Sequence, residues 1–301
     1  MILRHKQIVS FICLMCSGVA CSTLTTGGFE KLGYVVRENV TYREGDDFEL
    51  KLNIARPAKG RGPFPGIVFL FGGGYKVGNK SNWNFVIREA AKRGYVAAAI
   101  DYRLTDATDN GKPKYTFPSQ IHDAKCAVRW LRARAWKYRL DKDRIGVVGF
   151  SAGGNLALML GLTHSSNGLE GNCGNPKISS RVQAVINLAG GTDLALHYDI
   201  YPYDYGDLLG GTPDERPERF HAASPLTYVS SDDPPVLTIC GREDPVYMQE
   251  LLLDRTMKEV GASHTLVVRE GVGHLRSQLV NFAEDNVAWE FLDEQLKHGQ
   301  E

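Results

Sequence analysis

The chain of 301 residues carries 35 Lys and Arg against 35 Asp and Glu, so its formal net charge is zero. This balance argues against nucleic acid as a principal partner, because proteins that bind polyanions carry an excess of basic residues. Hydrophobic residues make up 43% of the chain, which is typical of a globular protein and excludes a disordered or collagen-like one.

The N-terminal segment predicts a signal peptide over residues 1–20. Arg4 and Lys6 precede the mostly apolar residues 8–15, and small residues stand before Cys21. Cys21 also suits a bacterial lipoprotein signal, in which this cysteine carries the lipid. We therefore expect an exported protein that is periplasmic, secreted or lipid-anchored at the cell envelope, with membrane contact only through a lipid on Cys21. No later segment is apolar over a length that suggests a membrane span.

Eight short stretches rich in Val and Ile predict strands, and helical patterns lie between most of them. Strands and helices alternate after an initial pair of strands, which predicts an α/β fold with a mostly parallel eight-stranded sheet and helices on both faces. We expect one domain over residues 21–301, with a small aromatic-rich insertion at about 192–225. The expected strands are 34–36, 48–54, 66–71, 96–100, 145–150, 182–188, 235–240 and 264–269, and the expected helices are 82–92, 119–136, 153–162, 246–260 and 280–296.

The helix expected at 119–136 has an apolar face, so we interpret its basic residues, which include Lys125 and Arg129, as a solvent-exposed face. Three cysteines follow the N-terminal segment, and their spacing does not suggest a zinc site. Cys126 and Cys240 lie in apolar patterns and are interpreted as buried thiols, while a disulfide that involves Cys173 stays open.

The sequence Gly-Phe-Ser-Ala-Gly-Gly at 149–154 follows an expected strand and opens an expected helix. A serine in so tight a turn needs small neighbours, and the turn projects its hydroxyl above the carboxyl edge of the sheet. Ser151 is therefore the predicted nucleophile. The free N–H groups at the start of the following helix favour negative charge there.

A second glycine-rich loop, Phe-Gly-Gly-Gly-Tyr at 71–75, follows the strand expected at 66–71. Main-chain N–H groups of Gly73 and Gly74, together with that of Ala152, could surround the oxyanion of a tetrahedral intermediate. A phosphate-binding loop is disfavoured because the Gly-x-x-x-x-Gly-Lys-Ser/Thr pattern is absent.

Serine needs a base, and the base needs an acid to orient it. His274 follows the last expected strand, so it can reach the same edge of the sheet. For the acid we select Asp244, which follows the strand at 235–240, with its neighbour Glu243 as the reserve.

The order serine, acid, histidine resembles the α/β-hydrolase superfamily. The motifs at 72–74 and 149–154 are similar to those of esterases related to hormone-sensitive lipase, and the segments 101–104, 117–124 and 143–145 resemble bacterial acetyl-xylan and feruloyl esterase-like enzymes. The resemblance implies Ser151 as nucleophile, His274 as base and Asp244 as its partner. It implies Gly73, Gly74 and Ala152 as oxyanion donors, and no metal or organic cofactor.

One position departs from the family pattern, because Phe71 stands where a histidine usually precedes the glycines. The expected activity is hydrolysis of a carboxylic ester through an acyl-enzyme, on a small-molecule or carbohydrate ester. Two alternatives stay open. One is a serine peptidase of the prolyl-oligopeptidase type, although this chain lacks room for the extra domain of that group, and the other is an inactive surface binding protein.

We interpret the insertion at about 192–225 as one wall of an acyl or sugar pocket; it contains His197, Tyr198, Tyr201, Tyr203 and Tyr205. Tyr75 and Trp83 are expected on the opposite wall, and a packed surface loop anchored by its tyrosines is the alternative. The sequence shows no long amphipathic lid, so a short or aromatic acyl group is favoured over a long lipid chain.

Overall fold

The computed structural model describes residues 32–105, 108–109, 112–174, 176–276, 282 and 286–297. The predicted signal peptide and Cys21 lie outside these residues. Within them, no helix combines the length and the apolar character that crossing a membrane requires.

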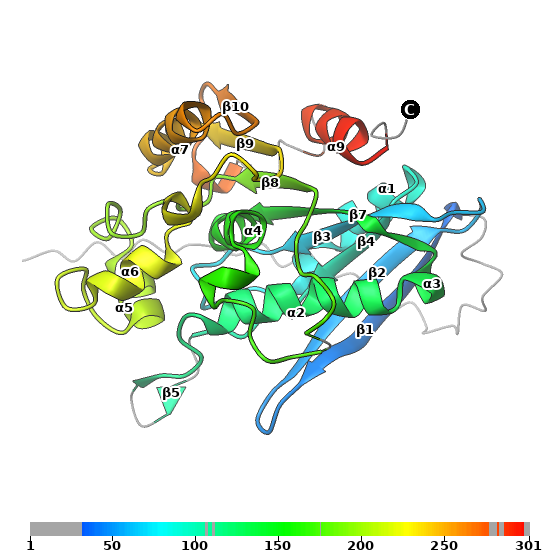
Figure 1. Ribbon diagram of the computed structural model, residues 1–301, viewed down its shortest axis with the longest axis horizontal. Coiled ribbons are helices and arrows are strands. Elements are labelled where there is room, and N and C mark those ends of the chain that lie inside the picture. Colours follow the sequence, from blue (N-terminus) through cyan, green and yellow to red (C-terminus); the bar gives the residue numbers. More distant parts are fainter. Residues whose placement is uncertain are drawn as a thin grey trace, which may run out of the picture.

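Eight strands form one sheet in the order β1-β2-β4-β3-β7-β8-β9-β10 (Figure 1). β1 and β2 are antiparallel, as are β2 and β4, and all the other neighbours are parallel. The predicted mostly parallel, eight-stranded sheet is therefore confirmed. The strands are β1 (Tyr34–Glu44), β2 (Glu49–Pro57), β3 (Phe64–Leu70), β4 (Val96–Ile100), β7 (Leu140–Phe150), β8 (Ala184–Leu188), β9 (Val236–Gly241) and β10 (His264–Arg269), and a separate pair joins β5 (Thr108–Asp109) and β6 (Lys112–Pro113).

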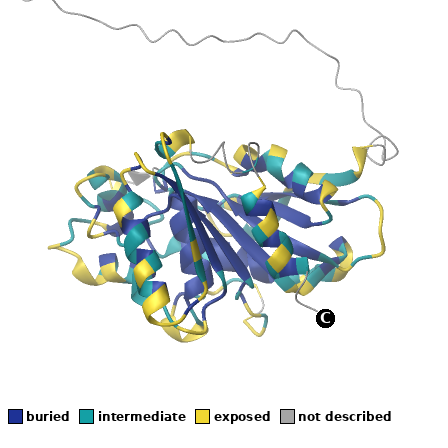
Figure 2. Ribbon diagram, turned by 90° about the horizontal axis from the view of Figure 1, so that it is seen from above, coloured by how far each residue is buried: buried dark blue, intermediate teal, exposed yellow. Residues whose placement is uncertain are grey.

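The core lies on both faces of the central strands. All residues of β4 and β8 are buried, which explains why β4 is entirely apolar and β8 is apolar except for Asn187. Figure 2 shows these buried strands between helices whose outer faces are exposed. β1 is an edge strand with several exposed polar residues, so the apolar pattern detected only its first residues.

Helices pack on both faces of the sheet. α4 contacts β3, β7 and β8, and α2 packs on α4, while α1 contacts β2 and β4, and α9 contacts β7 and β8. The α-helices are α1 (Asn84–Lys92), α2 (Ser119–Ala133), α3 (Ala135–Tyr138), α4 (Ala152–Leu162), α5 (Pro202–Leu209), α6 (Pro217–Ala223), α7 (Tyr247–Glu259) and α9 (Val287–Lys297), and the 3₁₀ helices are η2 (Lys80–Trp83), η3 (Ser165–Asn167) and η4 (Pro225–Tyr228).

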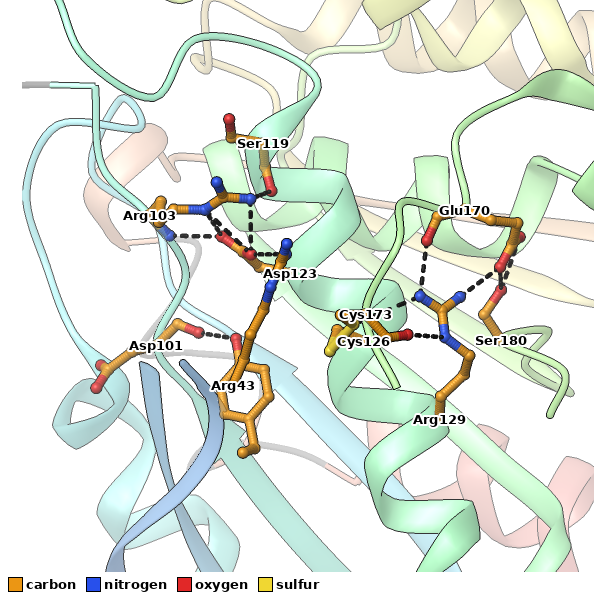
Figure 3. The surroundings of a disulfide bond; sticks show 11 residues. Arg43, Asp101, Arg103, Ser119, Asp123, Cys126, Arg129, Glu170, Cys173 and Ser180 are labelled. Carbon is orange, nitrogen blue, oxygen red and sulfur yellow. Dashed lines mark hydrogen bonds and ion pairs between the residues drawn. A yellow bond between two sulfur atoms is a disulfide. The ribbon is translucent and has the colours of Figure 1, made fainter. Parts of the chain in front are cut away.

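The interpretation of the basic residues of α2 as a solvent-exposed face is wrong for two of them. The Lys125 side chain is fully buried and that of Arg129 is 3% exposed, and both pair with Glu170, at 2.7 and 2.6 Å. Ser180 donates to the same carboxylate at 2.8 Å (Figure 3). Burial of these cations is tolerated because both form close ion pairs with the carboxylate of Glu170, from a distant loop.

A disulfide joins Cys126 of α2 to Cys173 in the loop that carries Glu170 (Figure 3). The interpretation of Cys126 as a free thiol is therefore wrong, whereas Cys240 is a buried free thiol as expected. Arg129 Nε also donates to the carbonyl oxygen of Cys173 at 3.2 Å. The disulfide and the ion pairs thus fasten the same loop to α2.

A second buried carboxylate connects α2 to the segment after β4. Asp123 is inaccessible to solvent and accepts hydrogen bonds from Arg103 Nε at 2.9 Å and Nη2 at 3.0 Å, while Arg43 of β1 also pairs with it (Figure 3). This contact joins the sequence segments 101–104 and 117–124, and it fixes the position of the residues that follow β4.

Candidate active site

Ser151 stands between the end of β7 and the start of α4 in a strained conformation, with φ 55° and ψ −119°. Non-glycine residues rarely adopt positive φ, and such strain is typical of functional turns. The neighbouring glycines make the turn possible. A Cβ atom on Gly149 would lie 1.9 Å from the carbonyl oxygen of Gly153, and one on Gly153 would lie 2.3 Å from that of Leu70.

Three loops that are far apart in the sequence bring Ser151, His274 and Asp244 together. Ser151 Oγ lies 2.8 Å from His274 Nε2, and His274 Nδ1 lies 2.9 Å from Asp244 Oδ2. Asp244 Oδ1 also accepts a hydrogen bond from the backbone N–H of Val246 at 3.0 Å, which orients the carboxylate. The Nδ1 atom therefore holds a proton toward Asp244, and Nε2 is free to accept one from Ser151.

The reserve acid, Glu243, points elsewhere. Its carboxylate accepts a hydrogen bond from the backbone N–H of Gly271 at 3.2 Å. The side chain of Asp244 is fully buried, whereas that of His274 is 19% exposed. The acid is thus shielded from water while the imidazole reaches the solvent-accessible cavity.

The loop at 71–75 is supported by the segment that follows β4. The rings of Phe71 and Tyr102 stack with centroids 4.1 Å apart, and Tyr102 Oη donates to the carbonyl oxygen of Phe71 at 2.7 Å. On the other side of the glycines, the backbone N–H of Thr105 donates to the carbonyl oxygen of Tyr75 at 2.9 Å. Stacking and backbone hydrogen bonds therefore hold the loop where the family usually has a histidine. Sequence reasoning missed Tyr102 and Thr105.

A cavity of about 200 Å³ adjoins Ser151 and His274. Gly73, Gly74 and Ala152 line it, which places their backbone beside the nucleophile. Ala152 is the first residue of α4, so its N–H group has no partner within the helix. These three groups are suited to receive an oxyanion. Further side chains at the wall belong to Tyr75, Tyr201, Asp204, Tyr205 and Leu275.

The structure brings only one of the four residues expected to bind substrate to this cavity, namely Tyr75. Trp83 is 1% exposed and packs on Phe69 in the core, with ring centroids 5.3 Å apart. Tyr203 is 83% exposed on the surface. His197 is buried behind the wall, and burial lowers its pKa against the opposing influence of Asp193 and Asp244.

Three residues of the predicted aromatic-rich insertion line the cavity, and of these Asp204 was missed from the sequence. Tyr201, Asp204 and Tyr205 come from α5 and the residue before it, within the aromatic-rich insertion. The tyrosine-rich pattern identified the correct segment. It did not separate Tyr201 and Tyr205, which line the cavity, from Tyr203, which does not, because the orientation of this short helix decides which side chains face the cavity.

A second buried carboxyl group lies near the triad. Glu250 of α7 is completely buried, and Asn187 Nδ2 donates to its two oxygens at 2.9 and 3.0 Å. Burial raises the pKa of Glu250 well above its usual range, and the negative charge of Asp244 adds to this effect. Its environment therefore disfavours the charged form of Glu250.

In the described ranges, one group of side chains has ligand atoms close enough for a metal ion: His164, Asp232 and Asp233. Arg181 occupies the same place, with Nη1 3.0 Å from His164 Nε2 and Nη2 2.9 Å from the carbonyl oxygen of Asp232. A guanidinium group already supplies the positive charge that these carboxylates need. The arrangement is thus an ion-pair cluster.

The fold and the site together define an α/β-hydrolase, in which a serine after β7, an acid after β9 and a histidine after β10 meet at one edge of the sheet. The BD-FAE family model matches residues 52–254, and the chain belongs to this family. The resemblance to hormone-sensitive-lipase-like esterases is therefore confirmed.

Known relatives are esterases. Esterase LipC of Mycobacterium tuberculosis (strain ATCC 25618 / H37Rv) is 30% identical over 261 residues, which cover 82% of this chain and 62% of LipC. Ethyl acetate hydrolase of Pseudomonas putida is 26% identical over 269 residues, which cover 84% of this chain and 79% of that enzyme. The chain spans 62%, 42% and 47% of the lengths of the mycobacterial esterases LipC, LipM and LipQ, respectively.

Solved structures agree with this relationship. A truncated carbohydrate esterase from gut microbiota matches with a TM-score of 0.74 and 26% identity, covering 87% of this chain and 96% of that structure. The thermophilic esterase Est2 of Thermogutta terrifontis, with propionate bound, matches with a TM-score of 0.68 and 29% identity, covering 87% of this chain and 91% of that structure.

Proposed function

We propose that this protein hydrolyses carboxylic esters through an acyl-enzyme formed on Ser151. The observation that carries the proposal is the continuous contact from Ser151 Oγ through His274 to Asp244, at 2.8 and 2.9 Å. A serine hydroxyl becomes a competent nucleophile when an oriented imidazole removes its proton. The esterase relatives support the same reaction.

In the first step, Ser151 Oγ attacks the ester carbonyl carbon while its proton passes to Nε2 of His274. The oxyanion that forms is received by the backbone N–H groups of Gly73, Gly74 and Ala152. The bond to the alcohol then breaks, and the leaving alkoxide takes the proton from His274. Water repeats the sequence on the acyl-enzyme, releasing the acid and regenerating Ser151.

We propose esters of short acyl groups as substrates. The cavity beside Ser151 measures about 200 Å³, below the range of roughly 300–1,000 Å³ typical of pockets for drug-sized ligands. Buried tyrosines, Tyr75 and Tyr205, close part of its wall. A relative that hydrolyses ethyl acetate and a structure with propionate bound support a short acyl group, and a carbohydrate esterase supports a sugar as the alcohol.

The reaction is tested with p-nitrophenyl acetate and the Ser151→Ala variant. Activity should be lost while circular dichroism and the unfolding temperature remain close to wild type, and undiminished hydrolysis would contradict the assignment. The acyl preference is tested by comparing kcat/KM for acetyl, feruloyl and long-chain esters. The cavity size predicts the highest value for acetyl, and a preference for long chains would contradict this prediction.

We also propose that the protein is exported. The support lies in the predicted signal peptide and in the Cys126–Cys173 disulfide, since disulfides persist mainly in oxidising compartments. Fractionation of cells that express the full chain tests export. Retention of the activity in a membrane fraction, with its release by Cys21→Ser, would identify a lipid anchor, and activity confined to the cytoplasm would contradict export.

A further inference from the structure

Asp204 places a carboxylate inside the cavity, directly against the glycine loop. It lies in the first turn of α5, and its side chain is 34% exposed. A Cβ atom built on Gly74 would lie 2.5 Å from Asp204 Oδ2 and 3.1 Å from Oδ1. The carboxylate therefore occupies the space that any side chain at position 74 would need.

A charged carboxylate is costly at this place. Burial raises the pKa of Asp204, and the developing oxyanion at Gly74 would be repelled by a negative charge beside it. Lys76 opposes the rise, with its Nζ 3.6 Å from Asp204 Oδ1. A carboxylate kept at a cavity wall despite this cost is a candidate for a role in binding.

Lys76 leaves the Asp204 carboxylate able to accept further hydrogen bonds. Its Nζ lies closer to Asp207 Oδ2, at 2.6 Å, and donates to the carbonyl oxygen of Tyr203 at 3.0 Å. These contacts fix the ammonium group on α5 outside the cavity wall. Asp204 thus keeps lone pairs that can accept a hydrogen bond from a bound substrate.

We propose that Asp204 accepts a hydrogen bond from a free hydroxyl on the carbon next to the esterified carbon of the alcohol. This inference rests on the proposed ester hydrolysis and assigns its alcohol: a monoester of a vicinal diol, as in a partly acylated sugar. The proposal follows from how close Asp204 lies to the expected position of the ester carbonyl oxygen. A vicinal hydroxyl lies near the ester carbonyl oxygen, and Gly74 borders both the expected oxyanion position and Asp204.

The charge of the insertion sets a second condition on the alcohol. Residues 192–225 contain seven acidic and two basic residues, and Lys76 is already paired with two of the carboxylates. An anionic alcohol would meet repulsion here. A neutral polyol, which can donate a hydrogen bond, therefore fits the site better than an anionic alcohol does.

Two small esters test the proposal. 2-Hydroxyethyl acetate carries the vicinal donor, and 2-methoxyethyl acetate replaces it with an ether oxygen that can only accept, while the two leaving groups have similar acidity. Wild type should favour the hydroxyl ester in kcat/KM by about tenfold, the effect of a charge-assisted hydrogen bond at a partly exposed site. In Asp204→Ala the ratio should approach one.

Asp199→Asn is the matched control, because Asp199 lies in the same insertion, is exposed and does not line the cavity. It should keep the wild-type ratio. If Asp204→Ala does not fold, Asp204→Asn replaces it, and its ratio should fall because the charge is lost.

Each of three results would overturn the inference. Wild type could hydrolyse the two esters at equal rates, the folded Asp204 variant could keep the wild-type ratio, or wild type could prefer acetylcholine to 2-hydroxyethyl acetate. If wild type hydrolyses none of these esters or p-nitrophenyl acetate, the proposed ester hydrolysis fails instead.

Discussion

Removal of the Cys126–Cys173 disulfide should destabilise the folded protein by an amount that follows from its place in the chain. The bond joins residues separated by 47 positions. In the chain-entropy description, a crosslink that closes a loop of this length stabilises the folded state by about 4 kcal/mol at 25 °C. The double variant Cys126→Ala/Cys173→Ala should lose about that free energy of unfolding.

Urea unfolding in non-reducing buffer, followed by circular dichroism, measures the difference. Wild type in excess reductant should show the same loss as the double variant, because both lack the crosslink. Cys240→Ala is the control: it removes a buried thiol without opening a loop and should cost only about 1 kcal/mol. Equal stability of wild type with and without reductant would refute the reasoning.

Three further predictions concern the triad and its surroundings. Asp244→Asn should lower kcat about 10⁴-fold on p-nitrophenyl acetate, because His274 would lose the acceptor that fixes its tautomer; a loss below tenfold would contradict this role. Gly149→Ala should lower kcat by about 100-fold or more, since its Cβ would lie 1.9 Å from a carbonyl oxygen and displace the nucleophile; near wild-type kinetics would show that the turn can relax. Glu250→Gln should stabilise the protein at pH 7. Burial raises the pKa of Glu250 above its ordinary 4.5, so its contribution to stability is full below pH 4.5 and declines as the pH rises, whereas Gln cannot ionise. Thermal unfolding from pH 4.5 to 8 should show the gain growing with pH, and a constant difference would contradict a raised pKa of Glu250.

The sequence predicted the central sheet well, because burial on both faces leaves a purely apolar signal. The strand at 96–100, which is buried throughout, has the expected bounds. The edge strand at 264–269 also has the expected bounds, although none of its residues is fully buried. β1 extends to Glu44, well beyond its apolar start, since an edge strand needs only one buried face. Two-residue strands such as β5 and β6 carry no periodic pattern at all.

Errors arose where the partner of a residue lies far away in the sequence. Helical periodicity assigned Lys125 to solvent, yet Glu170, 45 positions later, neutralises it in the interior. Cys126 was interpreted as a free thiol because nothing in the sequence indicates that Cys173 lies beside it. Local patterns do not encode such contacts.

The loops of the candidate site could be located from the sequence, because chemistry requires specific residue types and the fold places them after particular strands. The side chains that form the cavity wall could not be identified from the sequence. Trp83 lies in a 3₁₀ turn that directs its side chain into the core, whereas Asp204 lies in a short helix that directs its side chain toward the cavity. Both orientations depend on tertiary packing.

The close contact between Gly74 and Asp204 limits how this protein can be redesigned. Any larger amino acid at position 74 would push the first turn of α5 outward, so a library that varies the two positions separately would contain mostly damaged proteins. Productive variants should require simultaneous changes in the loop and in α5. The proposed oxyanion donor Gly74 and the proposed substrate-binding residue Asp204 therefore cannot be varied independently.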